Sequence, residues 1–256
     1  LDVMGDERRG HRSGDRAQRE EQGHRSGDLA QREELTRIVT DFVTRLTGKQ
    51  TIYQMIQLAE EVKKRGGTPR APLDYKKEYL RRLWSHIEDR IADLKAGRRH
   101  PEDLMLPGAQ DILEAFRARD IQCYLASGTD RPYVLGEAAA LGLTPYFGPH
   151  IYGALDDYEN FSKRMVIAQI LEENDLAGPE LIAFGDGFVE IEDTKAADGI
   201  AIGVASDEAA CQDMNDSDLP KYPVDKWKRE RLIQAGADVI IPNFLEYKAL
   251  MKYLEI

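Results

Sequence analysis

A short apolar run that ends in an acidic, glycine-rich turn constrains the fold of this chain more than any other stretch. Residues 181–184 are all apolar and lead directly into Gly185-Asp186-Gly187, with Glu190 four residues after Asp186. An apolar run of this length that is bounded by glycine is typical of a buried strand in a parallel sheet, and glycine lets the backbone turn sharply at the end of the strand. In open α/β sheets, ligands bind at the carboxyl ends of the strands. The stretch therefore predicts a ligand site there or, as the alternative, a solvated acidic loop.

The two carboxylates of this turn suit a metal ion. Mg²⁺ takes oxygen ligands and keeps several of its own waters, so it needs only one or two carboxylates from a protein. Asp186 and Glu190 are therefore candidate ligands for Mg²⁺.

Apolar runs and helical patterns alternate in the second half of the chain. The expected strands cover 121–126, 151–153, 181–184, 200–205 and 237–241. The expected helices lie at 112–116, 132–141, 163–171, 227–235 and 244–254. This alternation predicts an α/β fold, with a Rossmann-like parallel sheet and helices on both faces. The polar stretch 207–223 is expected to be a surface loop.

The region before these strands has helical patterns only. Apolar residues follow a helical spacing in three segments, 35–46, 52–62 and 79–94, and each segment is followed by glycine. We therefore predict an all-helical cap over residues 35–100, attached to a core over residues 101–256. Because Trp84 falls on the apolar stripe of the third segment, we expect it to belong to a packed core.

Residues 1–34 differ from the rest in composition. A 13-residue unit that starts at Gly10 is repeated from Gly23, and it has almost no apolar content. Such a segment cannot bury enough surface to offset its ordering entropy, so we expect it to be disordered or loosely helical. The repeated His11 and His24 are interpreted as part of a solvated tail, and not as metal ligands.

Composition excludes several classes of partner and site. The formal net charge of −11 argues against nucleic acid, which requires a basic face. No apolar run approaches the length of a membrane span and no signal peptide is visible, so a cytoplasmic protein is expected. Cys123 and Cys211 are too far apart in sequence to suggest a zinc site or a disulfide framework. The oligomeric state is not specified by the sequence.

Two more polar residues stand where expected elements end or begin. Ser127 follows the strand expected at 121–126, and its hydroxyl and nearby backbone N–H groups can bind a phosphoryl oxygen. Lys163 starts a helix, where the helix dipole disfavours a cation. This unfavourable position indicates a functional role, such as neutralising developing negative charge. The alternatives are a turn-forming serine and a solvated lysine.

The order of these residues resembles the haloacid dehalogenase superfamily. Tyr124–Thr129 is similar to its second motif, Ser162–Arg164 to its third and Phe184–Glu192 to its fourth, and Pro107-Gly108 resembles the turn before the second motif. The resemblance implies a Mg²⁺-dependent phosphatase that acts on a small phosphorylated metabolite. It also implies the residue roles: phosphate binding by Ser127, Gly128 and Lys163, catalysis by Lys163 and Asp186, and metal binding by Asp186 and Glu190.

One family motif lacks a recognisable counterpart. The family's nucleophile is the first aspartate of an Asp-x-Asp motif at the end of the central first strand. The nearest stretch here is Asp2-Val3-Met4-Gly5-Asp6, which has Met4 at the acid/base position and only Leu1 before it. We therefore expect the central first strand and the nucleophile to be missing, through truncation or a misjoined reading frame, and the chain to have little activity.

Two other functions are considered. A non-catalytic phosphate-binding or regulatory module would keep the fold and bind phosphate without turnover. A nicotinamide or flavin oxidoreductase is disfavoured, because no Gly-x-Gly-x-x-Gly follows a first strand. The residues of the expected cap do not identify a substrate.

Overall fold

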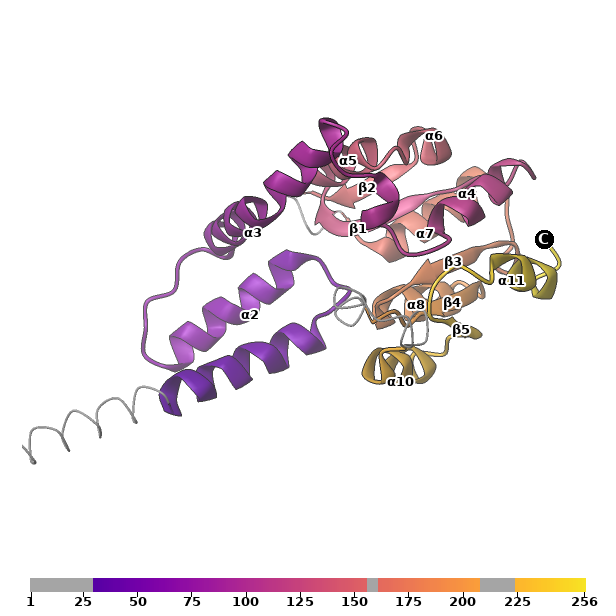
Figure 1. Cartoon of the computed structure of the whole chain (residues 1–256). Coiled ribbons are helices and arrows are strands. Elements are labelled where there is room, and N and C mark those ends of the chain that lie inside the picture. Colours follow the sequence, from indigo (N-terminus) through magenta and orange to yellow (C-terminus); the bar gives the residue numbers. More distant parts are fainter. Residues whose placement is uncertain (1–29, 156–160, 208–223) are drawn as a thin grey trace, which may run out of the picture. The chain divides into compact units, whose positions relative to one another are not determined.

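The computed structural model describes residues 30–155, 161–207 and 224–256 (Figure 1). The chain divides into two compact units, Leu1–Leu46 and Thr47–Ile256. In the first unit residues 30–45 are helical, so the helix includes five residues before the expected start of order at Leu35. Alanine, glutamine, arginine and glutamate dominate those five residues, and all are good helix formers. The first copy of the repeat, His11 and His24 lie outside the described residues.

The second unit begins with two helices that pack against each other, α2 (Thr51–Lys64) and α3 (Pro72–Lys95). Their buried apolar residues include Ile52, Met55 and Leu94. The expectation that Trp84 is a core residue is wrong, because 37% of it is exposed and its ring contacts Tyr133 at 5.9 Å between centroids. The reason is length, since α2 has 14 residues and cannot cover all of the 24-residue α3.

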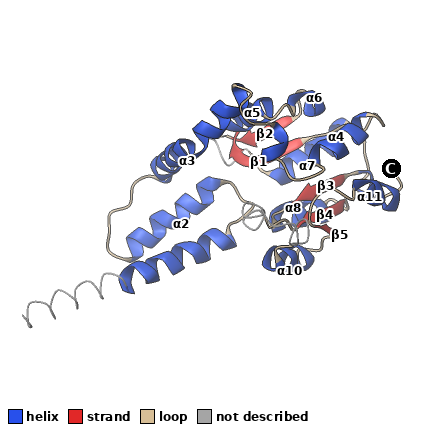
Figure 2. Ribbon diagram, in the orientation of Figure 1, coloured by secondary structure: helices blue, strands red, loops and turns tan. Residues whose placement is uncertain are grey.

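Strands and helices alternate through the rest of the unit, as predicted (Figure 2). The elements in order are η1 (Pro101–Leu104), α4 (Ala109–Arg117), β1 (Leu125–Asp130), α5 (Arg131–Ala140), α6 (Thr144–Phe147), β2 (Ile151–Ala154), α7 (Lys163–Glu173), η3 (Gly178–Glu180), β3 (Ile182–Gly185), α8 (Phe188–Ala196), β4 (Ile200–Val204), α10 (Lys226–Gln234), β5 (Val239–Ile241) and α11 (Tyr247–Tyr253). Most of the surface loop expected at 207–223 lies outside the described residues.

The strands form two parallel sheets instead of one. One sheet has the order β1-β2, and the other has the order β3-β4-β5. Phe184 of β3 lies opposite Ile202 of β4, which in turn lies opposite Val239 of β5. Within the part of the chain that the structure describes, no strand pairs with both β1 and β3. The sheet is therefore interrupted between these two strands.

β1 lies later in the chain than expected. The sequence predicts a strand over 121–126, but pairing starts only at Leu125, opposite the first residue of β2. The residues before Leu125 have no partner in β2, because β2 begins at Ile151, the residue opposite Leu125. The ladder is irregular between Ala126 and Asp130. Ser127 consequently lies inside β1, in its irregular part, and not after the end of the strand.

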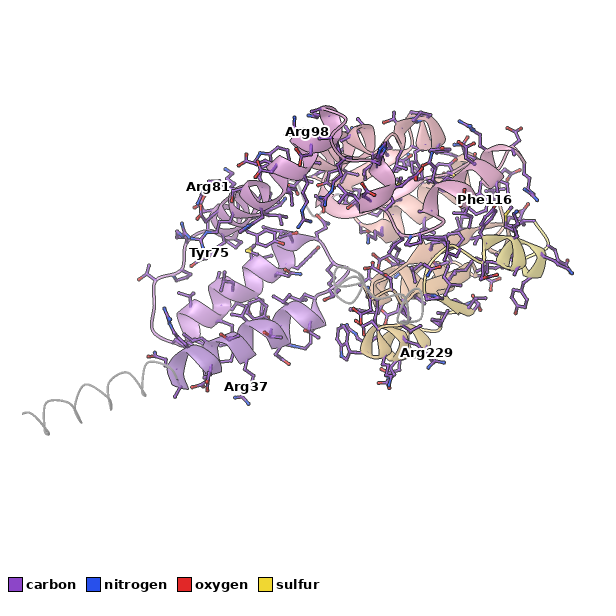
Figure 3. All side chains as sticks on the ribbon, in the orientation of Figure 1. Arg37, Tyr75, Arg81, Arg98, Phe116 and Arg229 are labelled. Atoms are coloured by element: carbon purple, nitrogen blue, oxygen red, sulfur yellow. The ribbon has the colours of Figure 1, made fainter. Side chains whose placement is uncertain are left out.

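Helices cover both faces of the β3-β4-β5 sheet. Ala201 and Ile202 are neighbours on β4, so their side chains point to opposite faces. Ile202 belongs to a cluster with residues of α4 and α11, which are Ile112, Phe116, Leu250 and Met251 (Phe116 is labelled in Figure 3). Ala201 belongs to a cluster with Ile191 of α8 and Leu232 of α10. This arrangement is the predicted Rossmann-like packing of helices on a parallel sheet.

Among the described helices, none is both long enough and apolar enough to cross a membrane.

Candidate functional site

The segment 47–50, which leads into α2, lies against the carboxyl ends of both β1 and β3. A Cβ on Gly128 would lie 3.4 Å from the carbonyl oxygen of Lys49, and a Cβ on Gly187 would lie 3.3 Å from the Cα of Gly48. The last residues of β1 and the turn after β3 therefore approach the same short piece of backbone. The strand ends from the two separate sheets face one region, as expected for a site in an α/β fold.

The glycines around Asp186 make room for a side chain. A Cβ on Gly185 would lie 2.7 Å from the Cβ of Glu190, and a Cβ on Gly187 would collide with Oε2 of the same residue. Neither glycine has a positive φ. Glycine is thus required here because Glu190, in the first turn of α8, folds back over the turn.

Lys163 and Glu190 are brought together in the structure. The Nζ of Lys163 donates to Oε1 of Glu190, and the two side chains are only 14% and 16% exposed. Lys163 is the first residue of α7, whose start is fixed by the Ser162 hydroxyl, which accepts from the N–H of Met165 at 3.1 Å. Burial lowers the pKa of Lys163 to about 8, although the nearby Asp186 carboxylate raises it. The ammonium is thus mostly charged at neutral pH.

The second oxygen of Glu190 fits a cation. Oε2 is buried and has no hydrogen-bond partner among the described residues. An unsatisfied buried acceptor costs about 1–3 kcal/mol, and more when it is charged. A hard cation would satisfy it. No group of three or more histidine, cysteine, aspartate or glutamate side chains forms a metal site in the described ranges, so water or substrate would complete the ligand shell.

Asp186 lies near a lysine that the sequence motifs do not include. Its side chain is 67% exposed, and its Oδ2 lies 3.9 Å from the Nζ of Lys228 in α10. Lys228 also donates to the carbonyl oxygen of Ser206 at 2.9 Å. A signal for Lys228 was present in the sequence, because it is a cation in the first turn of a helix, as Lys163 is.

Ser127 and Gly128 reach the region from β1. The hydroxyl oxygen of Ser127 accepts from the N–H of Thr129 at 3.1 Å, so its O–H is still able to donate. Gly128 contacts the segment 47–50, as described above. The structure thus connects Lys163, Asp186 and Glu190 by charge contacts or proximity, whereas Ser127 and Gly128 approach through that segment.

Two further side chains around the region were missed at the level of sequence. Gln50 is buried, and its Nε2 donates to the carbonyl oxygen of Phe161 at 2.5 Å, two residues before Lys163. Lys76 of α3 is 3% exposed and lies 2.6 Å from Asp130, the last residue of β1. The first contact joins the start of α2 to the residues before α7, and the second joins α3 to the end of β1. No local sequence pattern predicts such long-range pairs.

Comparison with known proteins identifies the family. A family model for haloacid dehalogenase-like hydrolases matches residues 21–198, which is more than half of the chain. Comparison with curated proteins gave no significant match.

Several solved structures have a similar fold. They include a haloacid dehalogenase-like protein of unknown function from Agrobacterium tumefaciens, with 18% identity over 85% of this chain and 84% of the other and a TM-score of 0.55. A β-phosphoglucomutase from Clostridium difficile has 14% identity over 84% and 82%, with a TM-score of 0.57. A predicted phosphoglycolate phosphatase from Haemophilus somnus has 12% identity over 82% and 81%, with a TM-score of 0.53. At such identities the likeness shows the fold. The family match over residues 21–198 establishes that the chain belongs to the haloacid dehalogenase-like hydrolase family.

Proposed function

We propose that this chain has the site of a Mg²⁺-dependent phosphohydrolase for a small phosphorylated metabolite. The observation that carries the proposal is the buried pair of Lys163 and Glu190 beside Asp186, at the carboxyl end of β3. Two acids and a lysine at a strand end are the groups that a phosphoryl-transfer site needs. Family membership and the presence of a predicted phosphoglycolate phosphatase among the similar folds agree with this proposal.

Each residue has a role in this proposal. Asp186 and Glu190 hold Mg²⁺, directly or through water, and the unpaired Oε2 of Glu190 supports this. When bound, the cation offsets the negative charge that develops during phosphoryl transfer. Lys163 holds a phosphoryl oxygen and neutralises its charge. The hydroxyl of Ser127 and the N–H of Gly128 donate to the other phosphoryl oxygens.

The break between the two sheets is the proposed place of the central strand. In the family, that strand ends in the aspartate that attacks phosphorus, and water then releases phosphate from the aspartyl-phosphate. β1 and β3 are the edges of the break. The candidate Asp2 lies outside the described residues. Because no Asp-x-Asp motif at the end of a strand is recognisable in the sequence, we expect little turnover from this chain.

The remaining assignments also belong to this proposal. Residues 35–100 form the helical cap and 101–256 the core. The substrate is a small phosphorylated molecule in the cytoplasm, and the net charge of −11 does not support nucleic acid as a partner. A non-catalytic phosphate-binding module is the second candidate, and the break between the sheets favours it.

Binding of inorganic phosphate in the presence of Mg²⁺, measured by calorimetry, tests the site itself. Lys163→Ala should weaken binding about tenfold or more, because a charged hydrogen bond to phosphate is lost. Lys195→Ala is the control, because Lys195 lies in the last turn of α8 and pairs with Asp238. If wild type binds no phosphate, or both variants behave alike, the proposed function is wrong.

An assay with Mg²⁺ and an aryl phosphate tests the state of the nucleophile. We expect phosphate binding with little or no hydrolysis. Robust hydrolysis that disappears in Asp186→Ala would contradict the missing-nucleophile proposal. The variant Asp2→Asn would then show whether Asp2 is the attacking group.

A further inference from the structure

Lys228 is held beside the acidic turn by a helix that none of the family-like motifs includes. It lies in the first turn of α10, and its side chain is only 14% exposed. Lysine is rarely buried to this extent unless it has partners. Its Nζ lies 2.9 Å from the carbonyl oxygen of Ser206 and 3.9 Å from Oδ2 of Asp186. The ammonium therefore stands at the carboxyl ends of both β3 and β4.

The position of Lys228 is fixed by the fold around it. Ser206 follows β4, is 3% exposed and bridges to Val224 just before α10. The N–H of Asp225 donates to the carbonyl oxygen of Ala205 at 3.1 Å, and the Asp225 carboxylate caps the helix by accepting from the N–H of Lys228 at 2.9 Å. The start of α10 is thus attached to the end of β4 at several points.

The same helix also contacts the element that follows the turn. The guanidinium of Arg231 stacks on the ring of Phe188, with 4.5 Å between its Cζ and the ring centroid. Phe188 is the first residue of α8 and directly follows Gly187. This contact consequently holds Lys228 close to the turn that carries Asp186.

Each of the two candidate cation ligands has a lysine beside it. Glu190 is paired with Lys163, and Asp186 has Lys228 at 3.9 Å. A divalent cation and an ammonium are both attracted to the same carboxylate, and they repel each other at this range. A cation that binds Asp186 must therefore overcome the charge of Lys228.

We propose that Lys228 is an internal competitor for the cation at Asp186 and that it sets the divalent-cation affinity of this site. The inference rests on the proposed function, because it takes Asp186 and Glu190 as the cation ligands. The simpler role of Lys228 is structural, to fasten α10 to β4 through Ser206. The two roles make opposite predictions for metal affinity.

Mn²⁺ binding, followed by the electron paramagnetic resonance of free Mn²⁺ and by competition with Mg²⁺, distinguishes these roles. Lys228→Gln removes the charge and keeps a donor for Ser206. We expect it to bind Mn²⁺ about tenfold more tightly than wild type, since one unit charge close to a partly solvated carboxylate is removed. Lys228→Met should show the same increase, and Lys228→Arg should not.

The control is Lys226→Met, which removes the same charge from an exposed position on the same helix. It should change the affinity less than about twofold, because solvent and salt screen it. Asp186→Asn should weaken Mn²⁺ binding in the wild-type and the Lys228→Gln backgrounds. Circular dichroism and thermal unfolding would establish that each variant is folded.

The outcomes separate this inference from the proposed function. Equal or weaker Mn²⁺ binding by folded Lys228→Gln, with wild-type binding that depends on Asp186, overturns the role of Lys228 and leaves the proposed function in place. Binding that appears only when the charge of Lys228 is removed supports the inference. If neither wild type nor Lys228→Gln binds Mn²⁺, both the inference and the proposed metal site are wrong.

Discussion

Glu190 shows how a single side chain determines its neighbours in sequence. Its carboxylate folds back over the turn, so positions 185 and 187 have no space for a Cβ. One of its oxygens pairs with Lys163, and the other is buried without a partner among the described residues. The Gly-Asp-Gly pattern is therefore a packing requirement as much as a functional one.

Replacement of Gly187 tests this packing requirement. Gly187→Ala places a methyl group against Oε2 of Glu190 and near the Cα of Gly48, so it should destabilise the fold by about 1–3 kcal/mol. Urea denaturation measures the change. The matched control is Gly136→Ala in α5, where a Cβ meets nothing within 4 Å. That change should stabilise the fold by up to about 1 kcal/mol. Similar effects for the two variants would contradict the packing argument.

At the scale of elements, two ion pairs connect helices to strands: one joins α3 to the end of β1, and the other joins α8 to the residue before β5. Asp130 is the N-cap residue of α5, yet its side chain makes no capping hydrogen bond. It pairs instead with the buried Lys76 of α3. Buried ion pairs contribute little net stability, but the loss of one partner is costly. This pair therefore specifies how α3 meets the end of β1 more than how stable the fold is.

Lys76→Met should destabilise the protein by about 3 kcal/mol, because it leaves the Asp130 carboxylate without its buried partner. Lys77→Met, on the exposed neighbour, should change stability by less than about 0.5 kcal/mol. The free energy of unfolding is measured with urea. Adding Asp130→Asn to Lys76→Met should restore part of the loss. Equal stabilities of Lys76→Met and Lys77→Met would show that the ion pair has no role in stability.

Asp238 fastens the start of β5 to its neighbours and predicts a pH dependence. Burial raises its pKa, but hydrogen bonds from the N–H of Ala201 and from Lys195 lower it more, so the net shift is downward. A carboxylate with a lowered folded-state pKa stabilises the fold above its unfolded-state pKa, and that stability is lost as the pH falls through the folded-state value. The contribution is at most about 1 kcal/mol, because the side chain is 40% exposed and solvent screens it.

Asp238→Asn should therefore lower stability at neutral pH and reduce the loss of stability on acidification. Urea midpoints measured from neutral to acidic pH would show this as a flatter acid limb than in wild type. Asp89→Asn, on an exposed position of α3, provides the control and should leave the slope unchanged. An acid limb as steep as that of wild type would contradict the role of Asp238.

Across the whole molecule, the interruption between the two sheets is the dominant feature. β4 pairs on both sides and is almost fully buried, whereas β3 pairs with one strand in the described ranges and is partly exposed throughout. β1 likewise has β2 as its partner among the described strands and is partly exposed. Backbone protection should follow this difference.

Hydrogen exchange followed by mass spectrometry measures this difference in backbone protection between β4 and the strands β3 and β1. We expect amides in 200–204 to exchange more slowly than those in 182–185 and 125–130, because local opening requires fewer broken contacts at the interrupted edge. The three segments are compared within one sample. Equal protection of β3 and β4 would mean that the edge of β3, which pairs with no other described strand, is covered in solution.

Local patterns were sufficient to predict most elements but not their pairing. The helical spacing and Ser162 predicted the start of α7, and the apolar run at 181–184 predicted β3 to within a residue. The predicted position of β1 was wrong because the ladder starts only where β2 offers a partner, at Ile151 opposite Leu125. The residues around Leu125 do not contain that information. Of the residues that the family motifs singled out, Lys163 pairs with Glu190 of the acidic turn, and the roles of the site residues stay predictions. Lys76 and Lys228 were missed because their partners are distant in sequence, although Lys228, like Lys163, is a cation in the first turn of a helix.

The segment 47–50 has a mechanical consequence. It lies against Gly128 near the end of β1 and against Gly187 in the turn after β3, and Gln50 donates a hydrogen bond to Phe161 beside the start of α7. α2 follows it without an intervening residue. The position of α2 is therefore coupled to β1, to the acidic turn and to the start of α7 through this one segment, and a shift of α2 would be transmitted to all three.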